Sequence, residues 1–267
     1  MWLPVLPALG TTRRCIALDL PGFGRSEGEL DTGHATVPAL AGTVLAAADA
    51  LGLDSFDLAG HDIGGGIAQH LAATSGRVSR LVLMNSVMFD SWPVPAVERF
   101  RDPQVRAATT APDLLDARAG STRRAIKRTL SDEELTDYLS PWTEPARHRS
   151  WMAMAAADPR YTLDLVPLLQ EARIPTRLVW GSEDDFQKVS FAHRYVNEIP
   201  GSDLVEVDGT HPHRRFTRRR RPGHPWATWA PDRQATAPAE LAGRDRPGTA
   251  QAVPCQVCRP NGITPTG

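Results

Sequence analysis

The sequence predicts an α/β fold, in which helices cover a mostly parallel sheet. Short runs of apolar residues, each of strand length, alternate with longer segments that have helical spacing. The runs are apolar throughout, which is typical of strands buried on both faces of a parallel sheet. The chain has 267 residues, of which 41% are hydrophobic and 23% charged, so it is long enough to bury a large core.

Five strands and at least three helices are expected along the chain. The strand ranges are Arg14–Leu20, Ser55–Ala59, Arg80–Met84, Thr176–Trp180 and Asp203–Val207. Helical spacing predicts helices over Val37–Leu53, Gly64–Ala73 and Val189–Glu198. Ligands of open parallel sheets bind beyond the carboxyl ends of the strands, so we expect the functional residues there.

The segment 86–164 interrupts this alternation, because it is amphipathic, has helical spacing and contains no readable strand. Its tryptophans are Trp92, Trp142 and Trp151. We therefore expect 86–164 to form a helical cap over a core made of 1–85 and 165–211. The alternative is further α/β structure whose strands the pattern does not reveal.

The last part of the chain, 212–267, has a different composition. It holds 10 Arg and 3 acidic residues, a net charge of +7, whereas the preceding residues sum to −8 and the whole chain to −1. Large apolar side chains are too few to order it, so we expect disorder. An arginine arm for nucleic acid at 214–221 is one interpretation. We favour instead a change of reading frame near His211, and we expect no nucleic-acid partner.

Composition also excludes several other classes of protein. No apolar run approaches the roughly 18 to 20 residues of a membrane span, and no secretory signal is recognisable, so no membrane partner is expected. Three cysteines are too few for a disulfide framework, which favours the cytoplasm. Cys255 and Cys258 lack the second ligand pair of a structural zinc site, and we attribute their spacing to chance.

A glycine-rich turn follows the expected strand Ser55–Ala59. It reads Gly60-His61-Asp62-Ile63-Gly64 and opens a helix, an order typical of an elbow that carries a nucleophile between two glycines. The glycines permit a strained turn and close packing, and the central Asp62 is raised towards the N–H groups of the helix N-terminus. The residue order of a phosphate-binding loop is absent. A purely structural turn is the remaining alternative.

Two further polar residues follow expected strand ends. Asp184 closes a Trp-Gly-x-x-Asp segment after Thr176–Trp180, and His211 comes shortly after Asp203–Val207. Each signal is weak alone. Together with Asp62 they give a nucleophile, an acid and a histidine in the order of a hydrolytic triad.

From Trp2 to His211 the chain resembles the α/β-hydrolase family. The resemblance rests on the loop Asp19–Ser26, the elbow, the Trp-Gly-x-x-Asp segment and the final Gly-x-His. The Asp at the elbow is similar to the branch that contains haloalkane dehalogenases, haloacetate dehalogenases and epoxide hydrolases. The resemblance implies no cofactor and no metal, and a small, mostly apolar substrate that reacts with water.

The resemblance also implies a role for each site residue. A carboxylate is already ionised at neutral pH, so Asp62 would attack an sp3 carbon, displace a halide or open an epoxide, and form an ester. His211 would then activate water, and Asp184 would orient the imidazole. The backbone N–H of Ile63 would stabilise the oxyanion.

Two departures from the family bear on the substrate. Dehalogenases of this branch commonly have Trp directly after the nucleophile, where this chain has Ile63, so a halide donor would come from 86–164. Epoxide hydrolases use two cap tyrosines, for which this chain offers Tyr138 and, as a weaker candidate, Tyr161. The candidate substrate-binding residues are therefore Trp92, Tyr138, Trp142 and Trp151. Packing in the core is the alternative for each of them.

A third departure is at the N-terminus. Family members carry earlier strands and a His-Gly loop ahead of the position of Trp2, so the resemblance implies a truncated chain without the second oxyanion donor. The expected function is still a hydrolase of a small epoxide or organohalide. A truncated or frame-altered, inactive derivative or binding module is one alternative. An esterase or C–C bond hydrolase is less favoured, because those usually have Ser at the elbow.

Overall fold

The computed structural model describes residues 2, 5–126 and 129–209 of the chain. His211, the segment 212–267 and the cysteines at 255 and 258 lie outside the described residues, so the predictions made for them stay predictions. Within the described ranges, no helix is long and apolar enough to cross a membrane.

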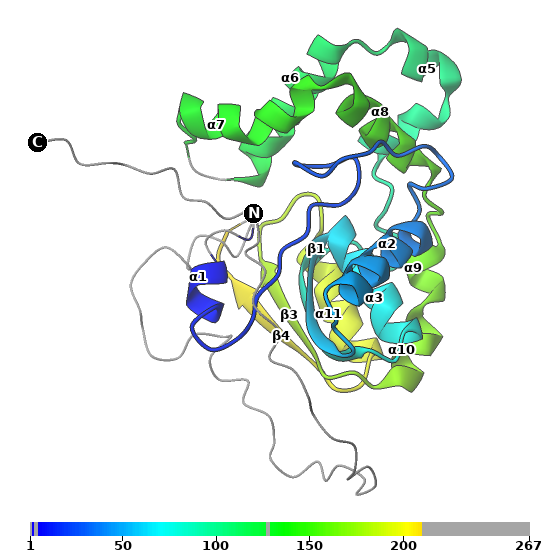
Figure 1. Cartoon of the computed structure of the whole chain (residues 1–267), viewed down its shortest axis with the longest axis vertical. Coiled ribbons are helices and arrows are strands. Elements are labelled where there is room, and N and C mark those ends of the chain that lie inside the picture. The colour runs from blue at the N-terminus through cyan, green and yellow to red at the C-terminus, as the bar shows by residue number, and fades with distance from the viewer. Residues whose placement is uncertain (1, 3–4, 127–128, 210–267) are drawn as a thin grey trace, which may run out of the picture. The chain divides into compact units, whose positions relative to one another are not determined.

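Four parallel strands form a sheet in the order β1-β2-β3-β4 (Figure 1). Their bounds are β1 Phe56–Asp62, β2 Val78–Ser86, β3 Thr176–Gly181 and β4 Ser202–Val207. The predicted α/β fold, with a parallel sheet and flanking helices, is therefore confirmed. Because the strands run the same way, their carboxyl ends meet at one edge, and Asp62 and Asp184 both belong to that edge.

The predicted strand Arg14–Leu20 is wrong. The segment has no strand assignment, and Ile16 and Leu18 are 40% and 44% exposed. Its apolar composition suggested a buried strand, but a strand also needs a neighbouring backbone to satisfy its N–H and C=O groups. Within the described part of the chain, β1 pairs only with β2. Side chains link this region to β1 instead, because Arg13 donates to Asp57 at 2.9 Å.

Four helices lie together on one side of the sheet (Figure 1). They are α2 Val37–Ala50, α3 Ile63–Thr74, α10 Val166–Ala172 and α11 Val189–Glu198. Helix α3 packs on β1 and β2, α11 packs on β3 and β4, and both α2 and α10 pack on α3. Right-handed crossovers between neighbouring parallel strands place the connecting helices on one face. Leu71 of α3 and Leu83 of β2 are fully buried in the core between these layers.

The opposite face of the sheet carries ion pairs. Side chains alternate along a strand, so Leu81 joins the helix-side core while its neighbour Arg80 points to the other face. Arg80 pairs with Asp57 at 3.3 Å, and Arg177 pairs with Asp203 at 2.5 Å, each in register across neighbouring strands. These partly exposed pairs keep the face polar and contribute little stability.

Between β2 and β3 the described chain is helical. The elements are α4 Pro95–Glu98, η1 Arg99–Arg101, α5 Pro103–Ala108, α6 Ala111–Ala125, α7 Asp132–Leu139, η2 Ser140–Thr143, α8 Pro145–Ala153, η3 Met154–Ala156 and α9 Tyr161–Asp164; a short α1, Leu6–Leu9, precedes them all. Helices α6 and α7 begin at capping boxes, formed by Thr110 with Asp113 and by Ser131 with Glu134. These caps satisfy N–H groups that a helix start would otherwise leave unpaired.

Helix α8 is tied to the chain that precedes α2. The backbone N–H of Leu30 donates to Ser150 Oγ at 2.9 Å. Arg149 and Glu29 form a two-point ion pair at 2.5 and 2.6 Å. Because α8 also carries Trp151, these contacts fix the position of that ring relative to the chain that precedes α2.

Candidate active site

The elbow has the backbone geometry that its sequence predicts. Strand β1 ends at Asp62 and helix α3 begins at Ile63, with no residue between them. Asp62 has φ 51° and ψ −126°, outside the usual regions for a residue with a side chain. The carbonyl of Asp62 accepts the N–H of Val87 at 2.9 Å, which holds the turn against β2. Such strain is concentrated at functional sites, because the surrounding structure must maintain it.

Close packing makes glycine necessary at two positions near this turn, Gly60 and Gly65. Gly64, which lies as far from Asp62 as Gly60 does, is not one of them. A Cβ added to Gly60 would lie 2.4 Å from the carbonyl oxygen of Gly64. A Cβ added to Gly65 would lie 2.2 Å from Ser86 Cβ, whereas one added to Gly64 would meet nothing within 4 Å. Close packing of α3 on β2 therefore depends on Gly65 rather than Gly64.

The Asp62 carboxyl has a raised pKa. Burial raises the pKa of Asp62 to about 6, and the neighbouring carboxylate of Asp184 adds to the rise. Three groups act in the opposite direction: the charge of Arg118, the backbone N–H of Ile63 and the side chain of Gln187. The carboxyl is thus ionised at neutral pH and receives hydrogen bonds from two directions.

Asp184 is buried and held by several donors. Its Oδ1 accepts the backbone N–H groups of Phe186 at 2.7 Å and of Gln187 at 2.9 Å. Its Oδ2 accepts from Asn85 Nδ2. Asn85 is anchored in turn, because its Oδ1 accepts the N–H of Gly181 at 3.1 Å. The carboxylate therefore has a fixed orientation beside the end of β3.

Gln187 connects Asp184 to Asp62, and sequence reasoning missed it. It is 2% exposed, and its carbonyl accepts from Trp180 Nε1 at 2.7 Å. Its backbone N–H binds Asp184 and its side chain donates to Asp62, so one residue links both carboxylates. The available signal was a polar residue three positions after Asp184 in a loop at the functional edge of the sheet.

The three candidate tryptophans lie together in the structure. Trp92 and Trp151 have ring centroids 6.2 Å apart, and Trp142 and Trp151 have theirs 5.8 Å apart at an interplanar angle of 86°. We call these three residues the tryptophan cluster. Trp92 is 5% exposed, and its buried Nε1–H has no hydrogen-bond partner within the described residues. Tyr138 is 46% exposed on α7 and makes no ring contact with the cluster.

Arg118 of α6 connects the tryptophan cluster to the elbow, and it too was missed from the sequence. Its guanidinium carbon lies 3.9 Å from the ring centre of Trp142 and 4.3 Å from that of Trp151. Burial lowers the pKa of Arg118 to about 10, and the charge of Asp62 limits the fall. Arg118 therefore stays protonated at neutral pH, and its charge acts on the same carboxyl as that of Asp184.

The arrangement of the elbow, the Asp184 loop and the helical segment matches a known family. The family model for the alpha/beta hydrolase fold covers residues 1–212. The chain belongs to the alpha/beta hydrolase fold family. The predicted superfamily is therefore confirmed.

Solved structures of this hydrolase fold are similar to the chain. An alpha/beta hydrolase fold protein from Burkholderia ambifaria superposes with a TM-score of 0.69 at 23% identity, over 78% of this chain and 77% of that one. A loop variant of a haloalkane dehalogenase from Bradyrhizobium elkanii gives a TM-score of 0.60 at 25% identity, over 79% and 77%. The first comparison bears on the fold alone.

Curated hydrolase-fold relatives cover different chemistries. The dihydrolipoyllysine-residue acetyltransferase component of the acetoin cleaving system of Pseudomonas putida is 30% identical over 203 residues, 72% of this chain and 50% of that protein. A 2-hydroxy-6-oxononadienedioate/2-hydroxy-6-oxononatrienedioate hydrolase of Klebsiella pneumoniae is 26% identical over 208 residues, 74% of this chain and 69% of that protein. The chain spans half or less of the length of the first three curated relatives it matches.

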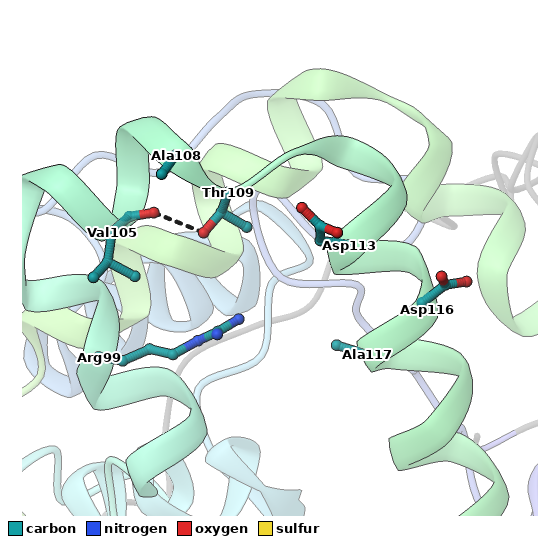
Figure 2. Close-up of a pocket in the computed structure, with 7 residues that line it drawn as sticks. All are labelled: Arg99, Val105, Ala108, Thr109, Asp113, Asp116 and Ala117. Atoms are coloured by element: carbon teal, nitrogen blue, oxygen red, sulfur yellow. Dashed lines mark hydrogen bonds between the residues drawn. The ribbon is translucent and has the colours of Figure 1, made fainter.

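A separate hollow on the helical segment contains neither Asp62 nor Asp184 (Figure 2). It has a volume of ≈ 500 Å³ and is lined by Arg99, Val105, Ala108, Thr109, Asp113, Asp116 and Ala117. Thr109 Oγ1 donates to the carbonyl of Val105 at 2.7 Å, and Asp113 belongs to the capping box of α6. Two of its polar groups thus already serve the local helical structure, and we do not assign the reaction to this hollow.

Proposed function

We propose that the chain is a hydrolase in which Asp62 attacks a small organohalide or epoxide and forms an alkyl ester. One observation carries the proposal: a carboxylate occupies the strained position that ends β1, directly before the N-terminus of α3. A carboxylate needs no base before it attacks, unlike a serine hydroxyl. The dehalogenase among the similar structures supports the same branch of the family.

The proposed reaction has two steps. An oxygen of Asp62 forms a bond to an sp3 carbon, and the carbon–halogen bond breaks with its electron pair leaving on the halide. With an epoxide, the ring C–O bond breaks and its oxygen takes a proton from a water molecule. His211 then takes a proton from water, whose oxygen attacks the carbonyl carbon of the ester. The ester bond breaks, the product alcohol takes that proton from His211, and the Asp62 carboxyl gives up the second proton of the water to solvent, which restores its carboxylate.

The second step needs donors for the oxyanion that forms on the Asp62 carboxyl group. Ile63 N–H is one candidate, as the sequence predicts. Gln187 is the other, because its side chain already donates to the carboxylate and its backbone is bonded at both N–H and C=O. We propose that Gln187 supplies the second oxyanion donor.

We further propose that 86–164 acts as a cap on a core of 1–85 and 165–211. The packing of Arg118 on the tryptophan cluster, together with its charge interaction with Asp62, supports this role. The unpartnered Nε1–H of Trp92 supports a halide as leaving group, because an indole N–H is a donor only. The exposure of Tyr138 gives less support to an epoxide.

C–C bond hydrolysis is the second candidate, because the Klebsiella pneumoniae relative is named for a hydrolase of an oxononadienedioate. That reading gives Asp62 an acyl rather than an alkyl partner. The two candidates predict different masses for a trapped intermediate, so one experiment separates them.

The test is to trap the intermediate. A His211→Gln variant should still form the ester but hydrolyse it slowly, so the Asp62 peptide should gain the mass of the alkyl group. The substrates are a 1-haloalkane, a short 2-halo acid, a terminal epoxide and, for the second candidate, a 2-hydroxy-6-oxononadienedioate. Each reaction is read by intact-mass and peptide mass spectrometry. The double variant Asp62→Asn/His211→Gln is the matched control and should gain no mass. Absence of an adduct with every substrate, in a variant that melts cooperatively, would contradict the proposal.

A further inference from the structure

Arg118 is a cation whose hydrogen-bond donors have no partner within the part of the chain that the structure describes. It lies one helical turn after Leu114, which is 3% exposed, so both side chains belong to the buried face of α6. Its described contacts are the faces of Trp142 and Trp151. A guanidinium has five N–H donors, and the side chain of Arg118 is only partly buried, so its donors are accessible to a ligand.

The rings that hold Arg118 are fixed before any ligand arrives. Trp142 packs edge-on against Phe23, with centroids 5.8 Å apart, and its backbone carbonyl contacts His148 Nε2. Trp151 packs against both other members of the tryptophan cluster. A rigid aromatic support keeps the guanidinium in one place, which is what a recognition site requires.

The charges around Asp62 explain what such a cation does there. The carboxylate of Asp184 disfavours a second negative charge at Asp62, so this edge of the sheet also disfavours an approaching anion. Arg118 is the described cation that counters Asp62. With Arg118 in place, an anionic group gains an attractive partner beside the proposed nucleophile.

We propose that Arg118 binds a carboxylate of the substrate, so that the site takes a small organic acid whose reacting carbon lies near that carboxylate. The inference rests on the proposed function of Asp62. The planar fork of N–H donors matches the two oxygens of a carboxylate, whereas a halide offers only one centre. The carboxylate is unchanged by the reaction; Arg118 holds it while the bond to Asp62 forms and the halide leaves. The sequence predicts a small, mostly apolar substrate, and Arg118 adds the requirement that this substrate carries a carboxylate.

The test measures binding without chemistry. Acetate and its uncharged analogue acetamide are titrated into the full chain, with tryptophan fluorescence and calorimetry as readouts. Acetate should bind about 10-fold or more weakly to Arg118→Met than to the wild-type protein. Acetamide should show no such difference. Arg123→Met removes the same charge from an exposed position of the same helix and should bind acetate as the wild type does.

A second variant keeps the test decisive if Arg118→Met does not fold. Arg118→Lys retains the charge but loses the planar fork, so it should also bind acetate more weakly than the wild type. Unchanged acetate affinity in the folded Arg118 variants, or no acetate binding by the wild-type protein, would overturn the proposal. If binding depends on Arg118 but no adduct forms on Asp62, the nucleophile assignment fails instead. An adduct on Asp62 without acetate binding removes only the role of Arg118.

Discussion

The elbow around Asp62 and the packing of Arg118 on the tryptophan cluster depend on different kinds of contact. The elbow depends on backbone: a strained φ at Asp62, a close approach at Gly65, and N–H donors at Ile63. The packing of Arg118 depends on its contacts with the rings of Trp142 and Trp151, which are more than twenty positions away in the sequence. Under the proposed function, local geometry therefore positions the reactive atom, and long-range packing selects the substrate.

The largest expected effect breaks the elbow from its backbone side. Gly65→Ala places a Cβ 2.2 Å from Ser86 Cβ, an atom that cannot rotate away, so α3 must shift from β2. We expect a loss of about 2 to 3 kcal/mol in the free energy of unfolding, which denaturant titration measures. Gly64→Ala, where nothing lies within 4 Å, should be neutral or slightly stabilising.

A double variant sharpens this comparison of neighbouring glycines. Gly65→Ala/Ser86→Gly removes the atoms nearest to the new methyl group and should recover part of the lost stability. Equal stability losses for Gly64→Ala and Gly65→Ala would show that the approach to Ser86 does not determine the choice of glycine here.

Much of the elbow was predictable from the sequence because its constraints are local. The order of Gly60, Asp62 and the following glycines reports a turn that only such residues can adopt, and the structure has that turn at Asp62. The parallel strands were recognisable from continuous apolar runs. Arg14–Leu20 has the same kind of run without being a strand, since pairing depends on a neighbouring backbone that the run itself does not encode.

The packing of Arg118 was not predictable from the sequence, because its constraints are not local. Arg118 is one of several arginines in α6 and its surroundings, and nothing in the local pattern distinguishes it from the exposed Arg123. Its role depends on where Trp142 and Trp151 lie, and those positions depend on α8 and its ties to the chain before α2. Gln187 was missed for a similar reason, because its contact with Asp62 joins two strand ends.

A smaller effect concerns the free energy of unfolding, which the ionised carboxyl of Asp62 lowers because the group is buried. The pKa of Asp62 is raised from 3.8 to about 6, so the folded protein binds this proton more tightly than the unfolded chain does. Stability from Asp62 is therefore full below about pH 4 and is lost as the pH rises through 6. Asp62→Asn mimics the neutral acid, and it should be more stable than the wild type at pH 7 by on the order of 2 kcal/mol.

Thermal melts from pH 4 to pH 8 measure this difference, which should vanish towards pH 4. Asp57→Asn on the same strand removes two partly exposed ion pairs, with Arg13 and Arg80, and should change stability by less than about 1 kcal/mol. A destabilised Asp62→Asn at pH 7 would mean that the donors around Asp62 outweigh its burial.

The smallest expected effect is a shift in the acid limb of the pH–rate profile. It compares directly how the helical segment and the sheet edge influence Asp62. Asp62 must be ionised to attack, so kcat/KM should fall as the pH decreases through about 6. Arg118 and Gln187 both lower the pKa of Asp62, one from the helical segment and one from the sheet edge. Arg118→Met and Gln187→Met should therefore each move the limb to higher pH.

The charge of Arg118 lowers the pKa of Asp62 more than the hydrogen bond from Gln187 does, so Arg118→Met should move the limb further. An uncharged 1-haloalkane is the substrate of choice, because its binding does not require the guanidinium and the midpoint then reports Asp62 alone. Arg123→Met should leave the midpoint where it is. If Gln187→Met moved the limb and Arg118→Met did not, the carboxyl would be controlled from the sheet edge alone, and the helical segment would act on the substrate only.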